Sequence, residues 1–347
     1  MEKPDTIVIT GSCGLIGSES VKFFHSKGFK IIGIDDDSRA KFFGKEASTN
    51  GMLSQLKELK NYQHLSINIS SYQDLQNSLS SIKDLKMIIH TAAQPSHDWA
   101  ATNPFADFNS NALGTLNMLE ITRNYFPDAV FIFTSTNKVY GDLPNNITKY
   151  TDSNTRFNPV NPDFLLNGIN ESLSIDQSKH SLFGVSKAYG DLITQEYGKY
   201  FGLKTGTFRG GCLTGQNHSG VKAHGFLSYL VKCAMTGEKY YINGYGGKQV
   251  RDNIHSSDVV SAFYEFYKNP KPGEVYNIGG GNLSNCSILE AIELIYKISG
   301  KRVDYELLET PREGDHIWYI SDMTKFRNHY PNWIQKYDLI KIIKEMI

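Results

Sequence analysis

The chain has 347 residues, enough for about two domains. Hydrophobic residues make up 40% and charged residues 21%, a composition typical of a packed globular protein and unlike a disordered one. The 36 basic and 36 acidic residues cancel, so no global charge recruits nucleic acid or a membrane surface. No apolar run approaches the ~20 residues that a membrane-spanning helix needs.

Short apolar runs alternate with helical patterns through the first part of the chain. Strands are predicted at 6–10, 30–34, 64–69, 87–90 and 130–133. A helical pattern with Val21, Phe23 and Phe24 follows the first of them. Continuous apolar runs are typical of strands with helices over both faces. The pattern therefore predicts an α/β fold, with a Rossmann-type doubly wound parallel sheet.

Residues 141–180 interrupt this alternation. Asn, Pro, Asp and Ser dominate the segment, and connections of this length are usually functional or mobile. Because it follows a strand end and precedes a helix at 183–187, we expect a flap over the active site. Beyond Arg209 the alternation is less regular, with one further strand at 275–278. A second, smaller and discontinuous domain is predicted there.

Three glycines, Gly11, Gly14 and Gly17, follow the first predicted strand and precede the helical pattern. Glycines at this spacing allow a tight turn, close approach of a pyrophosphate, and close packing of helix on strand. Asp35 ends the second strand, where a carboxylate can accept both hydroxyls of an adenosine ribose and repel a 2′-phosphate. The motif predicts NAD as cofactor, and Asp36 can share the role of Asp35. The alternative is an ordinary turn beside a surface acid.

The dinucleotide motif and the later change of pattern define two parts. We expect an NAD-binding domain over 1–210 and 252–281, and a substrate domain over 211–251 and 282–347. The four cysteines show neither CxxC nor Cys/His ligand spacing. This usage predicts reduced thiols, a cytoplasmic protein and no metal site.

Four segments together resemble a known family. They are Gly-Ser-Cys-Gly-Leu-Ile-Gly at 11–17, His-Thr-Ala-Ala-Gln at 90–94, Thr-Ser-Thr-Asn-Lys-Val-Tyr-Gly at 134–141 and Arg-Asp-Asn-Ile-His at 251–255. The chain is similar to the extended short-chain dehydrogenase/reductases of the nucleotide-sugar epimerase/dehydratase group, from residue 6 to about residue 330. Within the group it most resembles the CDP-paratose 2-epimerase branch, through 94–100, 136–142 and 247–252.

The resemblance implies the residues of the site. Cofactor contacts are expected from Gly11, Gly14, Leu15, Ile16, Gly17, Asp35, Asp36, Asn68, Ile69, Thr91, Ala92, Ala93, Gln94, Thr134 and Lys187. Substrate contacts are expected from Ser96, Asn137, Arg209, Arg251 and Arg312. A buried guanidinium suits the oxygens of a diphosphate, although a surface salt bridge is the alternative for Arg251 and Arg312.

The reaction that the resemblance implies is epimerisation of a nucleoside-diphosphate sugar in surface polysaccharide synthesis, by hydride transfer to NAD that stays bound. A tyrosine normally takes the proton, a lysine grips the nicotinamide ribose, and a Ser or Thr hydroxyl holds the reacting oxygen. Lys187 and Thr136 match the lysine and the hydroxyl. The tyrosine position, however, holds Phe183, which has no ionisable group.

Three explanations for the missing tyrosine are open. His180 or His97 can serve as the base, because histidine titrates near neutral pH. Lys187 can act through a water molecule or the ribose hydroxyl. The third possibility is that activity is lost and only binding is kept, as in a dinucleotide-holding sensor.

Related sugar-nucleotide dehydratases place an Asp-Glu pair after the Ser or Thr, whereas Asn137 and Lys138 stand here. That difference disfavours water elimination, and another NAD-dependent oxidoreductase or lyase is the remaining enzymatic alternative. Relatives commonly dimerise through a four-helix contact, so we expect a homo-oligomer, either a dimer or a tetramer. The helix at 181–200 can supply half of that contact.

Overall fold

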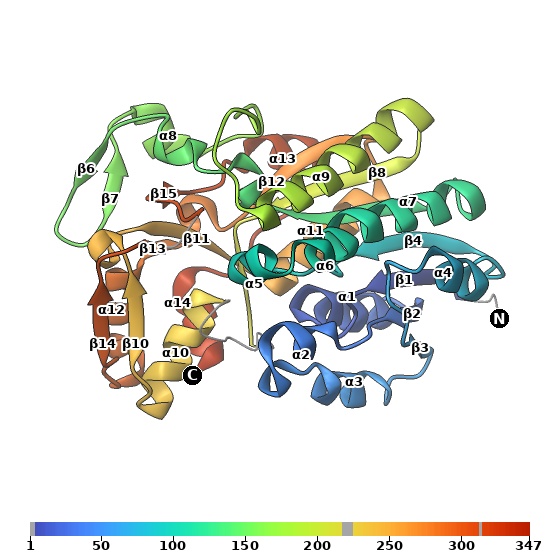
Figure 1. Ribbon diagram of the computed structural model, residues 1–347, viewed down its shortest axis with the longest axis horizontal. Helices are drawn as coiled ribbons and strands as arrows, with labels where there is room; N and C mark the ends of the chain where they lie inside the picture. The colour runs from blue at the N-terminus through green and yellow to red at the C-terminus, as the bar shows by residue number, and fades with distance from the viewer. Residues whose placement is uncertain (1–3, 217–224, 312–313) are drawn as a thin grey trace.

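The computed structural model describes residues 4–216, 225–311 and 314–347. Its main element is a seven-stranded sheet in which every pairing is parallel (Figure 1). In spatial order the strands are β12 (Glu274–Ile278), β8 (Lys204–Gly210), β5 (Val130–Thr136), β4 (Leu85–His90), β1 (Thr6–Thr10), β2 (Lys30–Ile34) and β3 (Tyr62–Leu65). This order confirms the doubly wound sheet.

The third predicted strand was misplaced, because β3 spans Tyr62–Leu65 and not 64–69. β3 is an edge strand whose residues are only partly buried or exposed, so its sequence lacks an apolar run. The apolar residues Ile67 and Ile69 that suggested a longer strand belong to the following turn, where they line a cavity.

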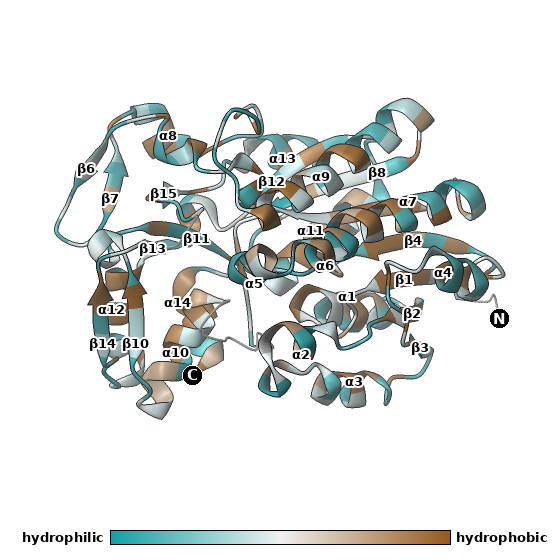
Figure 2. Ribbon diagram, in the orientation of Figure 1, coloured by the Kyte–Doolittle hydropathy of each residue, from teal (hydrophilic) through white to brown (hydrophobic). Residues whose placement is uncertain are grey.

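Helices cover both faces of this sheet (Figure 1). One face carries α1 (Leu15–Ser26), α3 (Asn50–Leu56), α11 (Ser256–Lys268) and α13 (Thr324–His329). The other carries α4 (Tyr72–Leu79), α7 (Gly114–Tyr125) and α9 (Leu182–Phe201). Ile7 and Ile9 pack in the first core and Val8 in the second, and all three are fully buried. Consecutive apolar residues along β1 and β4, brown in Figure 2, thus each meet a helix layer.

The rest of the chain forms smaller sheets beside the large one (Figure 1). Their strands are β10 (Tyr240–Asn243) with β14 (Tyr305–Leu308), and β11 (Val250–His255) with β9 (Cys212–Thr214), β13 (Asn285–Ser287) and β15 (Trp318–Tyr319). Around them pack α10 (Phe226–Thr236), α12 (Ile288–Ser299) and α14 (Leu339–Met346). Ser287 and Glu290 form a capping box that starts α12. The domain bounds given above stay a prediction.

Residues 141–180 are folded, but not where they were expected. They form β6 (Tyr150–Asp152), β7 (Phe157–Pro159) and α8 (Pro162–Asn167), which lie at the upper left of Figure 1. Ile147, Tyr150 and Phe164 pack against a core around Tyr140 and Trp318. None of these residues, all of which are described, lines the cavity at the sheet edge, so the predicted flap was wrong. The apolar side chains scattered among the polar ones anchor the segment to β15 instead.

Among the helices within 4–216, 225–311 and 314–347, none combines the length and the apolarity that a membrane span needs.

Candidate active site

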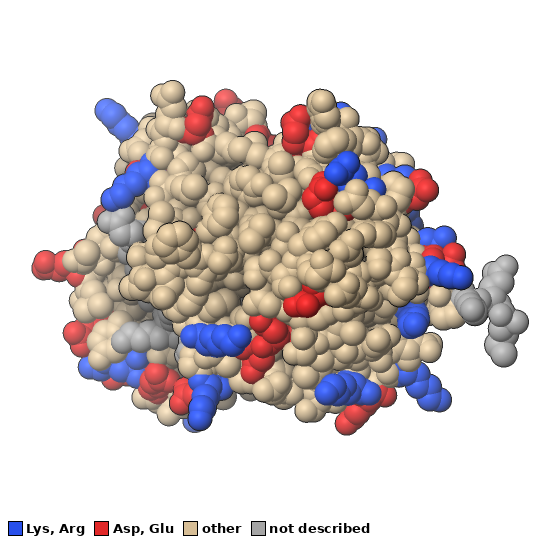
Figure 3. All heavy atoms as spheres, turned by 45° about the vertical axis from the view of Figure 1, so that its right-hand side comes forward, with Lys and Arg blue, Asp and Glu red and all other residues tan. Residues whose placement is uncertain are grey.

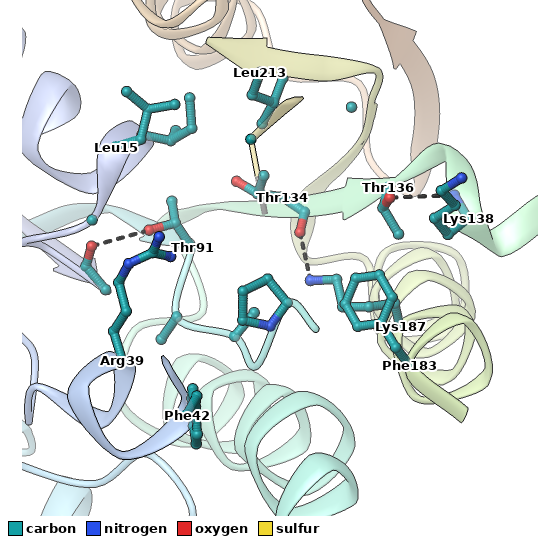
Figure 4. A pocket seen from close by; sticks show the side chains of 18 of the residues that line it. Leu15, Arg39, Phe42, Thr91, Thr134, Thr136, Lys138, Phe183, Lys187 and Leu213 are labelled. Carbon is teal, nitrogen blue, oxygen red and sulfur yellow. Dashed lines mark hydrogen bonds between the residues drawn. The ribbon is translucent and has the colours of Figure 1, made fainter. Parts of the chain in front are cut away.

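A cavity runs along the carboxyl ends of β1, β2, β4 and β5 (Figure 4). It encloses about 490 Å³, which is within the range of ligand-binding cavities. β1 pairs with β2 on one side and with β4 on the other, so the strand order reverses here. Open α/β sheets bind ligands at such a point, because the loops that leave the two sides diverge.

The glycine turn after β1 forms one wall of the cavity. Gly11 has a φ of +64°, and a Cβ at this position would lie 2.8 Å from the backbone nitrogen of Ala92. Gly14 caps α1 without a side-chain hydrogen bond, which leaves the first-turn N–H groups to a ligand. Gly11, Gly14, Leu15 and Ile16 all line the cavity, as expected.

Gly17 has a different role from the one expected. It does not line the cavity, and a Cβ there would lie 2.0 Å from the carbonyl oxygen of Gly11. The absence of a side chain therefore lets α1 pack directly on the turn. Gly17 shapes the cavity through this packing, and its expected cofactor contact stays a prediction.

Asp35 lies at the end of β2, with its carboxylate in the cavity wall. Oδ2 accepts a hydrogen bond of 3.0 Å from the Cys13 N–H, and Oδ1 accepts one of 2.9 Å from the Asp37 N–H. Burial raises the pKa of Asp35. A third, longer contact of 3.5 Å comes to Oδ1 from the Thr49 hydroxyl. Because a carboxylate has about four acceptor positions, one is left for a ribose hydroxyl.

Asp36 serves a supporting purpose in the same wall. It accepts hydrogen bonds from the Ser38 N–H and from Asn68 Nδ2, at 3.1 and 3.0 Å. Asp36, Asn68 and Ile69 all line the cavity, as expected. The bond to Asn68 joins the turn after β2 to the turn after β3.

The segment after β4 divides between the cavity and the interior. Thr91, Ala92 and Ala93 line the cavity, whereas Gln94 and Ser96 are buried and do not. Gln94 Nε2 donates to Asp107 over 2.8 Å. The Ser96 hydroxyl accepts from the Trp99 N–H over 3.2 Å and so caps α5 (His97–Thr102). The expected ligand contacts from these two side chains were wrong, because internal polar groups use them instead.

These walls fit NAD. The space that a Cβ at Gly11 would fill leaves room for a close backbone approach to a pyrophosphate, and the helix N-terminus favours its charge. The carboxylate of Asp35 lines the cavity and keeps an acceptor position that suits a ribose hydroxyl. Thr134 Oγ1, a buried hydroxyl without a hydrogen-bond partner in the described structure, lines the far end of the same cavity.

Lys187 projects from α9 toward the end of β5 (Figure 4). Its Nζ donates to the carbonyl oxygen of Thr134 over 2.7 Å and lies 4.3 Å from the ring centroid of Phe133. The residue is only 4% exposed. Burial lowers the pKa of Lys187 from 10.5 to about 7. A lysine held in this way can donate to a ligand hydroxyl and can exchange its proton near neutral pH.

Thr136 and Asn137 occupy the end of β5, and both line the cavity as expected. The Thr136 hydroxyl accepts a hydrogen bond of 3.2 Å from the Lys138 N–H, which caps the 3₁₀ turn Asn137–Tyr140. Because the oxygen accepts this bond, its own hydrogen can be donated to a ligand oxygen.

Phe183 lies one helical turn before Lys187 and faces the same cavity (Figure 4). The ring of His97 packs edge-on against it, with centroids 5.0 Å apart and planes at 66°. His97 Nδ1 lies 2.6 Å from the hydroxyl of Ser181, the residue that caps α9. His97 therefore stands in the cavity directly beside Phe183.

His180 is held away from the cavity. Its Nε2 lies 2.7 Å from the carbonyl oxygen of Val139, and its Nδ1 lies 3.0 Å from that of Ser178. Its expected role as base was wrong for a local reason: α9 begins after the cap Ser181, so His180 lies outside the helix. The helical spacing that would align it with Phe183 therefore does not apply.

A cluster of charges forms the opposite wall. Arg251 pairs with the carboxylate of Asp315, and Lys138 Nζ lies 3.7 Å from the same carboxylate and 2.9 Å from the Gly314 carbonyl oxygen. Burial lowers the pKa of Lys138 to about 8. Although burial alone would raise it, Arg251 and Lys138 hold the pKa of Asp315 well below its usual range. Arg251 lines the cavity as expected.

Arg209 has a structural role. Its guanidinium forms a two-pronged ion pair with Asp191, at 2.8 and 3.0 Å, and donates to the Tyr140 hydroxyl over 3.0 Å. It is 3% exposed and does not line the cavity, so the expected substrate contact was wrong. It lies on β8, where its side chain compensates a buried carboxylate on α9. Arg312 lies outside the described residues.

Known proteins share the sequence features of this site. A model of the NAD dependent epimerase/dehydratase family matches residues 7–163 and 167–279. The chain belongs to this family. NAD is accordingly the cofactor of this chain, and the glycine turn and Asp35 in the cavity wall fit it.

Relatives of this family member include both epimerases and dehydratases. The chain is 32% identical to CDP-paratose 2-epimerase of Salmonella typhi over 330 residues, which cover 93% of this chain and 92% of the relative. The fold is shared with dTDP-glucose 4,6-dehydratase of Bacillus anthracis in complex with NAD (TM-score 0.73, 24% identity, 99% and 95% coverage). It is also shared with UDP-glucose 4-epimerase of Thermotoga maritima with UDP-glucose (TM-score 0.76, 24% identity, 98% and 97% coverage).

The lining residues that were missed from the sequence include Lys138, Asp315, Arg39 and Phe42. Lys138 had a signal, since it lies two positions after Thr136 in the same motif. Asp315 and Arg39 follow no local pattern that separates them from surface charges. The position of Phe42 depends on a contact with a residue 57 positions later in the chain, Trp99, and sequence periodicity carries no such information.

Proposed function

We propose that this protein is an NAD-dependent epimerase of a nucleoside-diphosphate sugar, similar to CDP-paratose 2-epimerase. The supporting observation is that one cavity joins the glycine turn, the pair Lys187 and Thr136, and the cations Arg251 and Lys138. A cofactor site, a hydroxyl-handling site and a site for an anionic group are therefore contiguous. The relative at 32% identity supports a CDP-linked sugar.

When bound, NAD supplies reversible hydride transfer to and from a sugar carbon, the chemistry that an inversion requires. Thr136 donates a hydrogen bond to the reacting oxygen of the sugar. Lys187 donates to the nicotinamide ribose. Arg251 and Lys138 hold the diphosphate and so keep the sugar at the end of β5. Asn137 and Lys138 provide no carboxyl group, which argues against a dehydratase.

Phe183 replaces the usual tyrosine, and we assign the proton-accepting role to the His97 imidazole. Two contacts support the assignment: the edge-on packing against Phe183 and the hydrogen bond that joins Nδ1 to Ser181. Ser181 also caps α9, so the imidazole is tied to the helix that carries Lys187. Histidine can take up and release a proton near neutral pH without a large pKa shift.

The first experiment identifies cofactor and substrate. Purified protein is denatured, and the released nucleotide is measured by absorbance and mass spectrometry, with NAD(H) expected in near-equimolar amount. The protein is then incubated with CDP-, UDP- and dTDP-linked hexoses, and NMR follows the inversion of one carbon. Net reduction of NAD or release of water would instead indicate an oxidoreductase or a lyase.

Two variants then test the base. His97→Gln is expected to lose about 10²–10⁴-fold in kcat, with NAD content unchanged. Phe183→Tyr is expected to change kcat little if His97 is a dedicated base. A large gain in rate for Phe183→Tyr would contradict this assignment, and the route through Lys187 and a water molecule would replace it.

A second candidate function is a dinucleotide-binding protein without turnover. Phe183 is the observation that favours it, because the phenol required by the family reaction is absent. Tight NAD binding without inversion of any nucleotide sugar in the NMR assay would support this candidate over the epimerase.

We further propose that two copies of the chain pair through α9 and α6 (Pro104–Phe108). Leu182, Val185, Tyr189 and Leu192 lie three or four positions apart on α9, and each is 37–54% exposed. Phe105 on α6 is 85% exposed. Figure 3 shows a broad surface that is poor in charged side chains. Val185→Glu, which places a charge in this face, is expected to yield monomers in analytical ultracentrifugation.

The cytoplasm is the compartment that we propose. The four cysteines are free, and three of them are buried, a state that suits a reducing environment.

A further inference from the structure

We propose that Arg39, Phe42 and Trp99 form an arch across the cofactor half of the cavity, which grips the NAD pyrophosphate and slows release of the cofactor. Arg39 and Phe42 belong to α2 (Ser38–Phe43), and Trp99 belongs to α5. The inference requires that NAD binds in this cavity. It does not depend on which sugar is turned over, or on any turnover.

The first step is that α2 is anchored at its start. It begins after Asp37, a non-glycine residue with a φ of +55°. The Asp37 carboxylate accepts hydrogen bonds from the Thr49 N–H over 2.7 Å, from the Ser48 hydroxyl over 2.7 Å and from Asn50 Nδ2 over 3.0 Å. One side chain thus ties the start of α2 to the start of α3. Residues 38–47 therefore form a loop that leaves the end of β2 and is closed at its base by Asp37.

The second step is the contact that this loop makes through Phe42. The Phe42 and Trp99 rings have centroids 4.6 Å apart, with planes at 53°. α2 follows β2 and α5 follows β4, and these strands flank β1 on opposite sides. The contact therefore spans the crevice at the point where the strand order reverses. Phe42 also lines the cavity, so one side of the contact faces the cofactor.

The third step is the direction of Arg39. Its side chain extends from α2 across the cavity toward Thr91 at the end of β4 (Figure 4). The glycine turn, with Gly11 and Gly14, forms the wall beside it. A guanidinium on one side and a helix N-terminus on the other together favour a group with two phosphates. The pyrophosphate is the part of NAD that has this chemistry.

Release of the cofactor would require the arch to open. NAD below the contact cannot leave along the crevice while the Phe42 and Trp99 rings touch. α5 begins with His97 and continues to Trp99, so the helix that closes the arch also presents the proposed base. Such retention benefits an enzyme that oxidises and then reduces the same molecule, because loss of the reduced cofactor would leave the ketone intermediate unreduced.

The first test measures how fast bound NAD leaves. Holoprotein is mixed with excess NADH, and directly excited NADH fluorescence reports its binding as NAD departs. Phe42→Ala and Trp99→Ala are each expected to raise the exchange rate about tenfold, since an aromatic pair and its burial contribute on this scale. Trp99→Phe retains a ring and should stay near the wild-type rate. Lys41→Ala, on the exposed face of α2, is the matched control.

The double variant Phe42→Ala/Trp99→Ala decides whether the contact itself retains NAD. Its exchange rate should equal that of either single variant, because each substitution already opens the arch. Rates that multiply in the double variant, or single variants within twofold of wild type, would overturn the arch. Because NMR turnover is measured separately, a failed epimerase assay leaves this result interpretable.

The second test identifies what Arg39 binds. Bound NADH is displaced from Arg39→Met and from wild type by NAD, ADP, NADP and adenosine, and apparent affinities are compared. The variant is expected to lose about tenfold for NAD and ADP and little for adenosine, which has no phosphate. An equal loss for adenosine would mean that Arg39 only shapes the wall. A loss confined to NADP would mean that it binds a 2′-phosphate. Either outcome would refute the pyrophosphate assignment.

Discussion

The two halves of the cavity differ in what forms their walls. In the cofactor half, the glycine turn and the segment after β4 approach so closely that a Cβ at Gly11 would lie within 3 Å of two backbone atoms of Ala92 and of the Thr91 hydroxyl. In the substrate half, the walls are charged side chains, Lys187, Lys138, Arg251 and Asp315, which come from α9, from the turn after β5, from β11 and from the segment before β15.

This difference predicts that the two halves respond to different substitutions. A wall of backbone cannot move aside, so the cofactor half should tolerate no added atom. A wall of buried charges requires partners, so the substrate half should respond to removed charges and to pH. The variants below test this contrast, in order of decreasing expected effect.

The largest loss is expected when Lys187, the cation at which the substrate half meets the cofactor half, is removed. Lys187→Met is expected to lower kcat about 10²–10⁴-fold, because no other described residue donates from that position beside Thr136. The rate is measured by NMR with saturating NAD, and circular dichroism checks the fold. Turnover close to wild type would mean that the hydrogen bond from Lys187 to the nicotinamide ribose is not needed for the reaction.

Arg209 tests whether a buried charge outside the cavity matters for stability and not for binding. Arg209→Met leaves the Asp191 carboxylate, which is fully buried, without its ion-pair partner. The free energy of unfolding is expected to fall by about 3–5 kcal/mol, measured by urea titration. KM for the sugar nucleotide should be unchanged in protein that remains folded. An increase in KM without loss of stability would support the substrate contact that the sequence predicted for Arg209.

Gly17→Ala tests the rigidity of the cofactor half. The new Cβ would lie 2.0 Å from the Gly11 carbonyl oxygen, so α1 and the turn must separate. We expect a loss of about 1–3 kcal/mol in unfolding free energy and weaker NAD retention. Gly51→Ala is the matched control, since it also lies in a helix and no atom lies within 4 Å of its added Cβ. Equal stability of the two variants would contradict the backbone-wall description.

The smallest expected effect is a pH dependence of stability from Lys187. Its pKa is about 7 in the folded chain and 10.5 in the unfolded chain. Between these values the unfolded state binds the additional proton, so stability rises with pH, by up to about 1.4 kcal/mol per pH unit. Urea titrations of NAD-free protein at pH 8 and pH 9.5 should show a smaller rise for Lys187→Met. Parallel behaviour of the two proteins would mean that Lys187 is solvated in solution.

The contrast between the halves also explains which residues could be predicted. Gly11, Gly14 and Asp35 were predictable because a strand, a glycine turn and a helix are consecutive in the chain. His180 and His97 looked equivalent as bases, and only the position of the cap Ser181 separates them. Arg209 and Arg251 likewise have the same side chain and lie on strands of different sheets, and their surroundings, not their sequence motifs, decide their roles.

The amino-acid sequence by itself determined the parallel sheet, the cofactor turn and the presence of Lys187 and Thr136, because each depends on residues close together in the chain. Tertiary structure alone decided which charges face the cavity and which compensate one another inside. It also brought Phe42 to Trp99 and His97 to Phe183. These contacts join segments that lie far apart in sequence, and the packing of whole helices on the sheet, which no local pattern encodes, sets their distances.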